Sequence, residues 1–91
     1  MIHEAMRVMW CAQAAARMVG DQALIVLTQR GEVLVLNASG TWLWNQLGEA
    51  CSVRELAARL AVRFHLAEAR ALADVQQFVG ELLRIDAIVG V

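Results

Sequence analysis

The sequence predicts a single α+β domain of winged-helix-like form, in which a three-stranded antiparallel sheet is followed by three helices. Two observations carry this prediction. Short apolar runs bounded by glycine turns fill the first part of the chain, and apolar residues at helical spacing fill the second. The 91 residues, 59% of them hydrophobic, suffice for one buried core but not for two. We therefore divide the chain into an N-terminal extension (1–13), a β-meander (14–36), a three-helix part (38–85) and a tail (87–91).

The β-meander is predicted from its turns. The expected strands are Ala14–Val19, Gln22–Thr28 and Glu32–Leu36, separated by Gly20-Asp21 and by Gln29-Arg30-Gly31. Short connections make consecutive strands antiparallel neighbours, with a glycine supplying positive φ in the second turn. The central strand contains the continuous apolar run Leu24-Ile25-Val26-Leu27, which predicts that it is covered on both faces.

The three helices are predicted from capping signals and helical periodicity. Asn37 is an expected N-cap for a helix that runs to about Leu47, with Gly48 as its stop. Ser52-Val53-Arg54-Glu55 reads as a capping box that opens a second helix. A third helix is expected from about Ala67 to Ile85, and the apolar tail adds a short strand or docks on the core. The predicted core consists of Leu36, Leu43, Trp44, Leu47, Leu56, Leu60, Phe64, Val75, Phe78 and Leu82.

Charge disfavours nucleic acid as a partner. The net charge is −1, whereas a nucleic-acid binder of this size usually has a basic surplus on one face. The third helix, which would be the recognition helix of a helix-turn-helix, begins Ala67-Glu68-Ala69-Arg70 and carries Asp74 and Glu81. A winged-helix DNA-binding regulator is therefore the alternative function and not the main one.

Catalytic, metal and membrane functions find little support. Cys11 and Cys51 have no paired ligand spacing with each other or with His3 and His65, so we expect no metal or other cofactor and two thiols that are wholly or partly buried. No nucleophile, base or phosphate-binding loop stands out, and we expect no enzyme. The longest uncharged stretch, 33–48, is too short and too polar to span a membrane, and the N-terminus is a poor signal peptide. We expect a cytoplasmic protein.

Two features call for a partner. The third strand, 32–36, is the edge of an open meander, and it has one charge and no proline to block pairing. Trp42 points away from the buried face of the first helix. Two alternatives stay open: the C-terminal tail covers the strand, and Trp42 packs under residues 8–10.

Several short motifs follow one another along residues 15–89. They are Val19-Gly20-Asp21, Leu36-Asn37 with Gly40, Trp44-Asn45-Gln46-Leu47, Ser52-Val53-Arg54-Glu55-Leu56, Leu60-Ala61-Val62-Arg63-Phe64, Ala73-Asp74-Val75 with Phe78, Leu82-Leu83 and Ala87-Ile88-Val89. Each is weak alone, but in this order they resemble the PqqD-like proteins, also called RiPP recognition elements. The resemblance implies a module without catalysis that binds the leader of a ribosomally made precursor peptide and presents it to a modifying enzyme.

The resemblance also implies where the leader binds: as a strand antiparallel to the third strand, in the groove between that strand and the third helix. The expected peptide-binding residues are Glu32, Val33, Leu34, Val35 and Leu36 on the strand and Arg70, Asp74, Gln77, Phe78 and Glu81 on the helix. The opposite flank of the helix, with Leu72, Val79 and Leu83, is an alternative groove wall.

Departures from the family pattern affect the choice of pathway. The hairpin Thr28-Gln29-Arg30-Gly31 and the helix end Leu47-Gly48-Glu49 differ from the pyrroloquinoline quinone biosynthesis chaperones, and Ala67 and Ala87 replace the family's usual Asp and Gly. The chain is more similar to stand-alone elements of lasso-peptide clusters, which implies a leader peptidase, a cyclase or a radical enzyme as partner. The pyrroloquinoline quinone chaperone is the alternative within the family, and the state of oligomerisation, including a homodimer, is left open.

Overall fold

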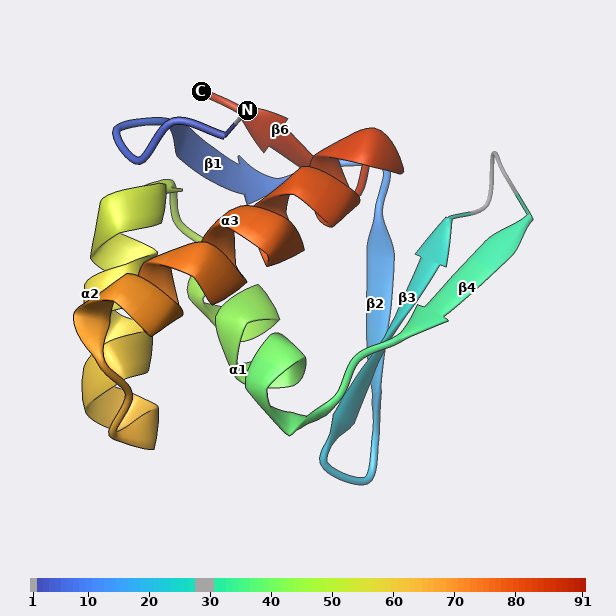
Figure 1. The fold of residues 1–91 in the computed structure, drawn as a ribbon. Coiled ribbons are helices and arrows are strands. Elements are labelled where there is room, and N and C mark those ends of the chain that lie inside the picture. The colour runs from blue at the N-terminus through green and yellow to red at the C-terminus, as the bar shows by residue number, and fades with distance from the viewer. Residues whose placement is uncertain (1, 28–30) are drawn as a thin grey trace.

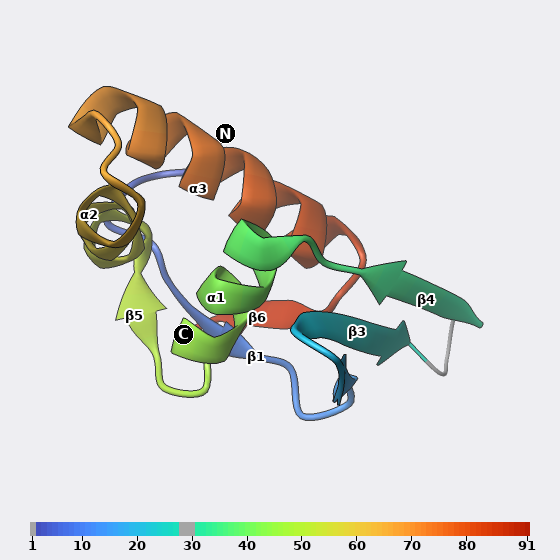
Figure 2. The same cartoon turned by 90° about the horizontal axis from the view of Figure 1, so that it is seen from below.

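The computed structural model describes residues 2–27 and 31–91, shown in Figure 1. In chain order the elements are β1 (Arg7–Trp10), β2 (Ala15–Val19), β3 (Gln22–Leu27), β4 (Glu32–Val35), α1 (Ala38–Gln46), β5 (Cys51–Ser52), α2 (Val53–Phe64), α3 (Glu68–Arg84) and β6 (Ile88–Gly90). The α+β class and the order of three strands before three helices are as predicted. The strands β2, β3 and β4 form a sheet that projects from the helices (Figures 1 and 2).

The projecting sheet is the expected antiparallel meander. Its strands pair in the order β2-β3-β4, and the two-residue turn between β2 and β3 uses Gly20 at φ 63°. Gly31 also has positive φ, as predicted, while the rest of the second turn and Thr28 lie outside the described residues. On β3 only one side is fully covered: Ile25 is buried, whereas Leu24 and Val26 on the other face are half-buried. The prediction of a strand covered on both faces is therefore wrong, because the helices pack on one face alone.

A second three-stranded sheet was not predicted. Strand β1 is central in the order β5-β1-β6, and its residue Val8, which is fully buried, pairs with Cys51 on one side and Gly90 on the other. Residues 7–10 are thus part of the fold and not an extension. The tail forms β6, one of the two outcomes expected for it.

The helices begin at the predicted caps. Asn37 Oδ1 accepts a hydrogen bond from the Gly40 N–H at 2.8 Å, and Ser52 and Glu55 form the complete capping box of α2. Helix α1 ends at Gln46, with Leu47 as C-cap, so Gly48 follows the cap without acting as a left-handed stop. Among the described residues, no helix is long and apolar enough to cross a membrane.

The core contains every side chain predicted for it, although Phe64 and Phe78 are only partly buried. Trp42 packs edge-on against Phe64 with ring centroids 5.7 Å apart, so the alternative of packing under residues 8–10 is wrong. The buried Thr41 hydroxyl oxygen accepts a hydrogen bond from the Ala23 N–H at 2.9 Å. This bond joins α1 to β3 and sets the position of the sheet beside the helices.

Candidate functional site

Strand β4 is an edge of the projecting sheet among the described residues, because β3 is its only paired neighbour. The Leu36 N–H donates to the Ala23 carbonyl oxygen at 2.9 Å, so the backbone of Leu36 faces β3. Backbone direction alternates along a strand, and the N–H and C=O groups of Val33 and Val35 therefore point to the open edge. The tail does not cover this edge, since β6 pairs with β1.

The two faces of β4 differ in burial. The side chains of Val33 and Val35 are each 57% exposed on the outer face of the sheet. Leu34, on the opposite face, packs against the core and is followed two residues later by the buried Leu36. Glu32 shares the face of Leu34, because side chains two residues apart point to the same side of a strand. The outward face therefore keeps its valines in solvent while the inner face anchors the strand.

A hollow of about 210 Å³ separates β4 from α3. Its walls come from the end of β4, the first turn of α1 and the second half of α3. The lining residues are Leu34, Val35, Leu36, Asn37, Gly40, Phe78, Glu81 and Leu82. Gly40 permits this arrangement, because a Cβ at its position would lie 3.5 Å from the Phe78 ring and 3.1 Å from the capping oxygen of Asn37.

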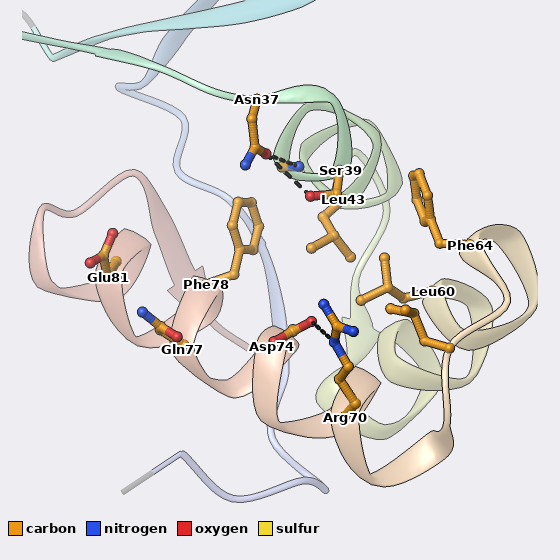
Figure 3. A pocket seen from close by; sticks show the side chains of 12 residues that line it. Asn37, Ser39, Leu43, Leu60, Phe64, Arg70, Asp74, Gln77, Phe78 and Glu81 are labelled. Atoms are coloured by element: carbon orange, nitrogen blue, oxygen red, sulfur yellow. Dashed lines mark hydrogen bonds and ion pairs between the residues drawn. The ribbon is translucent and has the colours of Figure 1, made fainter.

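A larger hollow of about 580 Å³ adjoins the first one and shares four of its residues, Asn37, Gly40, Phe78 and Glu81. Figure 3 shows it between α1, α2 and α3, with Leu43 and Leu60 toward its floor. Phe64 and Leu66 complete the apolar part. The polar rim consists of Asn37, Ser39, Arg70, Asp74, Gln77 and Glu81. Together the two hollows form one continuous groove, called here the β4–α3 groove.

The polar stripe of α3 faces this groove, and the apolar flank does not. Leu72 lines a different hollow together with Glu4 and Arg54, and Val79 is fully buried. The N-terminal segment runs along that other side, where the Gln76 side-chain amide donates to the Ile2 carbonyl oxygen at 2.9 Å. The side of α3 that borders β4 is thus the side of Arg70, Asp74, Gln77, Phe78 and Glu81.

Charges in the groove are unevenly matched. Arg70 and Asp74 form an ion pair at 3.8 Å, with side chains that are 71% and 49% exposed (Figure 3). Glu81 makes no ion pair with any residue in the described ranges 2–27 and 31–91. The groove can therefore offer backbone hydrogen bonds at one wall, apolar contact at its floor and carboxylates at the other wall.

Sequence reasoning placed seven of its ten site residues on the lining of the groove: Leu34, Val35, Leu36 and the helix residues except none of Arg70, Asp74, Gln77, Phe78 and Glu81 is missing, which makes eight in all.

 The count is therefore eight of ten, and the remaining two, Glu32 and Val33, lie on β4 beyond the lining. The groove residues that sequence reasoning missed as site residues come from α1, α2 and the turn after α2: Asn37, Ser39, Gly40, Leu43, Leu60, Phe64 and Leu66. Asn37 and Gly40 were visible as a cap and its spacing, but the helix packing that brings them to α3 was not.

The rest of the molecule offers no comparable chemistry in the part of the chain that the structure describes. Within those residues, no three His, Cys, Asp or Glu side chains are grouped so that they could hold a metal ion. Burial raises the pKa of the Cys51 thiol, which makes it a poor nucleophile near neutral pH. The β4–α3 groove is thus the candidate site, and its chemistry is that of binding.

Comparisons with known proteins agree with the fold. A family model described as "Coenzyme PQQ synthesis protein D (PqqD)" matches residues 22–88. A solved structure titled "TbiB1 in Complex with the TbiA(beta) Leader Peptide" superposes with a TM-score of 0.83 at 17% sequence identity, covering 91% of this chain and 96% of that chain. No curated protein matches the sequence.

Proposed function

Because the chain belongs to the PqqD family, we propose that it binds the leader segment of a ribosomally synthesised precursor peptide as a strand added to β4. The observation that carries the proposal is the open edge of β4 beside a groove. The outward backbone groups of Val33 and Val35 would bond to the peptide, and the groove would receive its side chains. The structural neighbour whose title names a leader-peptide complex supports the same mode of binding.

We further propose that the chain has no catalytic role of its own and presents the bound peptide to a modifying enzyme in the cytoplasm. A lasso-peptide pathway is favoured over pyrroloquinoline quinone synthesis, because the hairpin at 28–31 and the end of α1 depart from the pattern of the quinone chaperones. The partner would then be a leader peptidase, a cyclase or a radical enzyme.

Calorimetry with proline variants tests the binding mode. The ligand is the synthetic leader of the short precursor encoded beside this chain's gene. Val33→Pro and Val35→Pro each remove one outward N–H from the open edge without emptying the core, and each should abolish measurable binding. Val35→Thr keeps the N–H and should bind like the parent chain.

The opposite edge of the same sheet provides a matched control. Strand β2 pairs with β3 so that the backbone groups of Ala16 point away from β3, and Ala16 is exposed. Ala16→Pro therefore removes an outward donor from the wrong edge and should leave the affinity unchanged. If both β4 variants keep their circular dichroism spectrum and bind the leader normally, the peptide binds elsewhere and the proposal is wrong.

A further inference from the structure

We infer that the β4–α3 groove selects a leader that carries a lysine or arginine opposite Glu81. This inference rests on the proposed function and adds the chemical class of peptide that the groove prefers. It is carried by the position of Glu81, by the charges around it and by the effect of covering it with a peptide.

Glu81 occupies the junction of the groove. It lines both hollows, with Phe78 one turn before it and Leu82 beside it, and its residue is exposed. Figure 3 shows its side chain on the same side of α3 as Gln77 and Phe78. A peptide strand paired with β4 would lie across from this carboxylate, because β4 and α3 are the two walls of the smaller hollow.

The charge around Glu81 is negative. The charged residues that line the two hollows are Arg70, Asp74 and Glu81, and Arg70 is already paired with Asp74 at 3.8 Å. Glu32 adds a second carboxylate on the β4 wall, on the strand face of Leu34. Glu81 also lies near the C-terminal end of α3, where the helix dipole disfavours an anion and favours a cation.

Covering an unpaired carboxylate is costly. In the described part of the chain Glu81 has no cationic partner, so water alone satisfies it in the free protein. A peptide that fills the groove displaces part of this water, and burying a charge without a partner opposes binding. An ammonium or guanidinium group on the peptide replaces the lost water with a charge-assisted hydrogen bond. An acidic peptide would instead add repulsion and be rejected.

Selection from a phage-displayed library of random peptides tests this inference without knowledge of the natural leader. The parent chain should enrich peptides that contain lysine or arginine at one position relative to an apolar residue. Glu81→Gln should lose this enrichment, and Glu81→Lys should enrich aspartate or glutamate at the same position. The matched control is Glu68→Gln, which removes a carboxylate from α3 outside the groove and should select like the parent chain.

A double-mutant cycle then measures the pair. One enriched peptide is synthesised with its basic residue and with methionine in its place, and each is titrated into the parent chain and Glu81→Gln. The basic peptide should lose roughly three- to tenfold in affinity on Glu81→Gln, whereas the methionine peptide should lose none. The difference should shrink at high salt, because screening weakens a partly exposed pair.

The outcomes separate this inference from the proposed function. Enriched peptides that fail to bind Val35→Pro but show no basic preference would overturn the inference and leave strand addition intact. Enriched peptides that bind Val35→Pro and Val33→Pro as well as the parent chain would overturn both. Basic enrichment that is retained in Glu81→Gln would place the recognising anion elsewhere and would also overturn the inference.

Discussion

The indole ring of Trp10 stacks on that of Trp44, with ring centroids 5.4 Å apart, and its N–H donates to the Trp44 carbonyl oxygen at 2.7 Å. Trp10 comes from β1 and Trp44 from α1, so this contact ties the N-terminal strand to the helix that borders the groove. Gly48 makes room for it, because a Cβ there would lie 3.3 Å from the Trp10 ring. The glycine after α1 is thus required for packing and not as a helix cap.

The first prediction concerns this contact. Trp10→Ala removes the stacking and the hydrogen bond, and it should lower the free energy of unfolding by about 2–3 kcal/mol. Trp10→Phe keeps an aromatic ring and loses the N–H donor, so it should cost about 1 kcal/mol. Urea unfolding followed by circular dichroism measures both. Equal stability of all three proteins would show that β1 contributes little to the fold.

The second prediction concerns Asp74 in the β4–α3 groove. If its carboxylate accepts a hydrogen bond from the leader, Asp74→Ala should weaken binding by about 1–3 kcal/mol. The variant also frees Arg70 from its ion pair, so Arg70→Ala is measured beside it. Glu68→Ala, on the same helix but outside the groove, is the control. Calorimetric affinities that do not change for Asp74→Ala would remove this residue from the peptide site.

The third prediction concerns the capping box of α2. Hydrogen bonds from the Ser52 side chain and backbone N–H hold the pKa of the Glu55 carboxyl below its usual value. A lowered pKa in the folded state contributes stability above the unfolded pKa, and this contribution is lost as pH falls through the folded pKa. The parent chain should therefore be more stable than Glu55→Gln near neutral pH, and the difference should disappear in acid. Urea midpoints over a pH series measure it, and a difference independent of pH would contradict it.

The fourth prediction concerns the two thiols, which are not bonded to each other. Cys51 is 2% exposed and has a raised pKa because of burial, while Cys11 is partly exposed. Iodoacetamide should therefore modify Cys11 in the folded protein and Cys51 only after unfolding. Mass spectrometry of Cys11→Ser and Cys51→Ser identifies the labelled thiol. Fast labelling of folded Cys11→Ser would show that Cys51 is accessible.

Features that depend on a few neighbouring residues could be predicted from the sequence. The caps at Asn37 and Ser52 satisfy donors two or three residues ahead, so their partners are written beside them. The helical spacing of Leu56, Leu60 and Val75 likewise marks the faces that turn inward. The edge of β4 followed from the order of strands in a simple meander. The assignment of a family required the order of many weak motifs together.

Features that depend on distant partners were decided only by the tertiary structure. Strand β1 lies between β5 and β6, whose residues are more than forty and eighty positions away, and such short strands carry no periodic signal of their own. The same pairing takes the tail away from β4 and leaves that edge open. The N-terminal segment covers one flank of α3, which leaves the other flank, with Asp74 and Glu81, to border the groove. Both choices rest on which buried surfaces meet, and hydrophobic burial has no direction that a local pattern records.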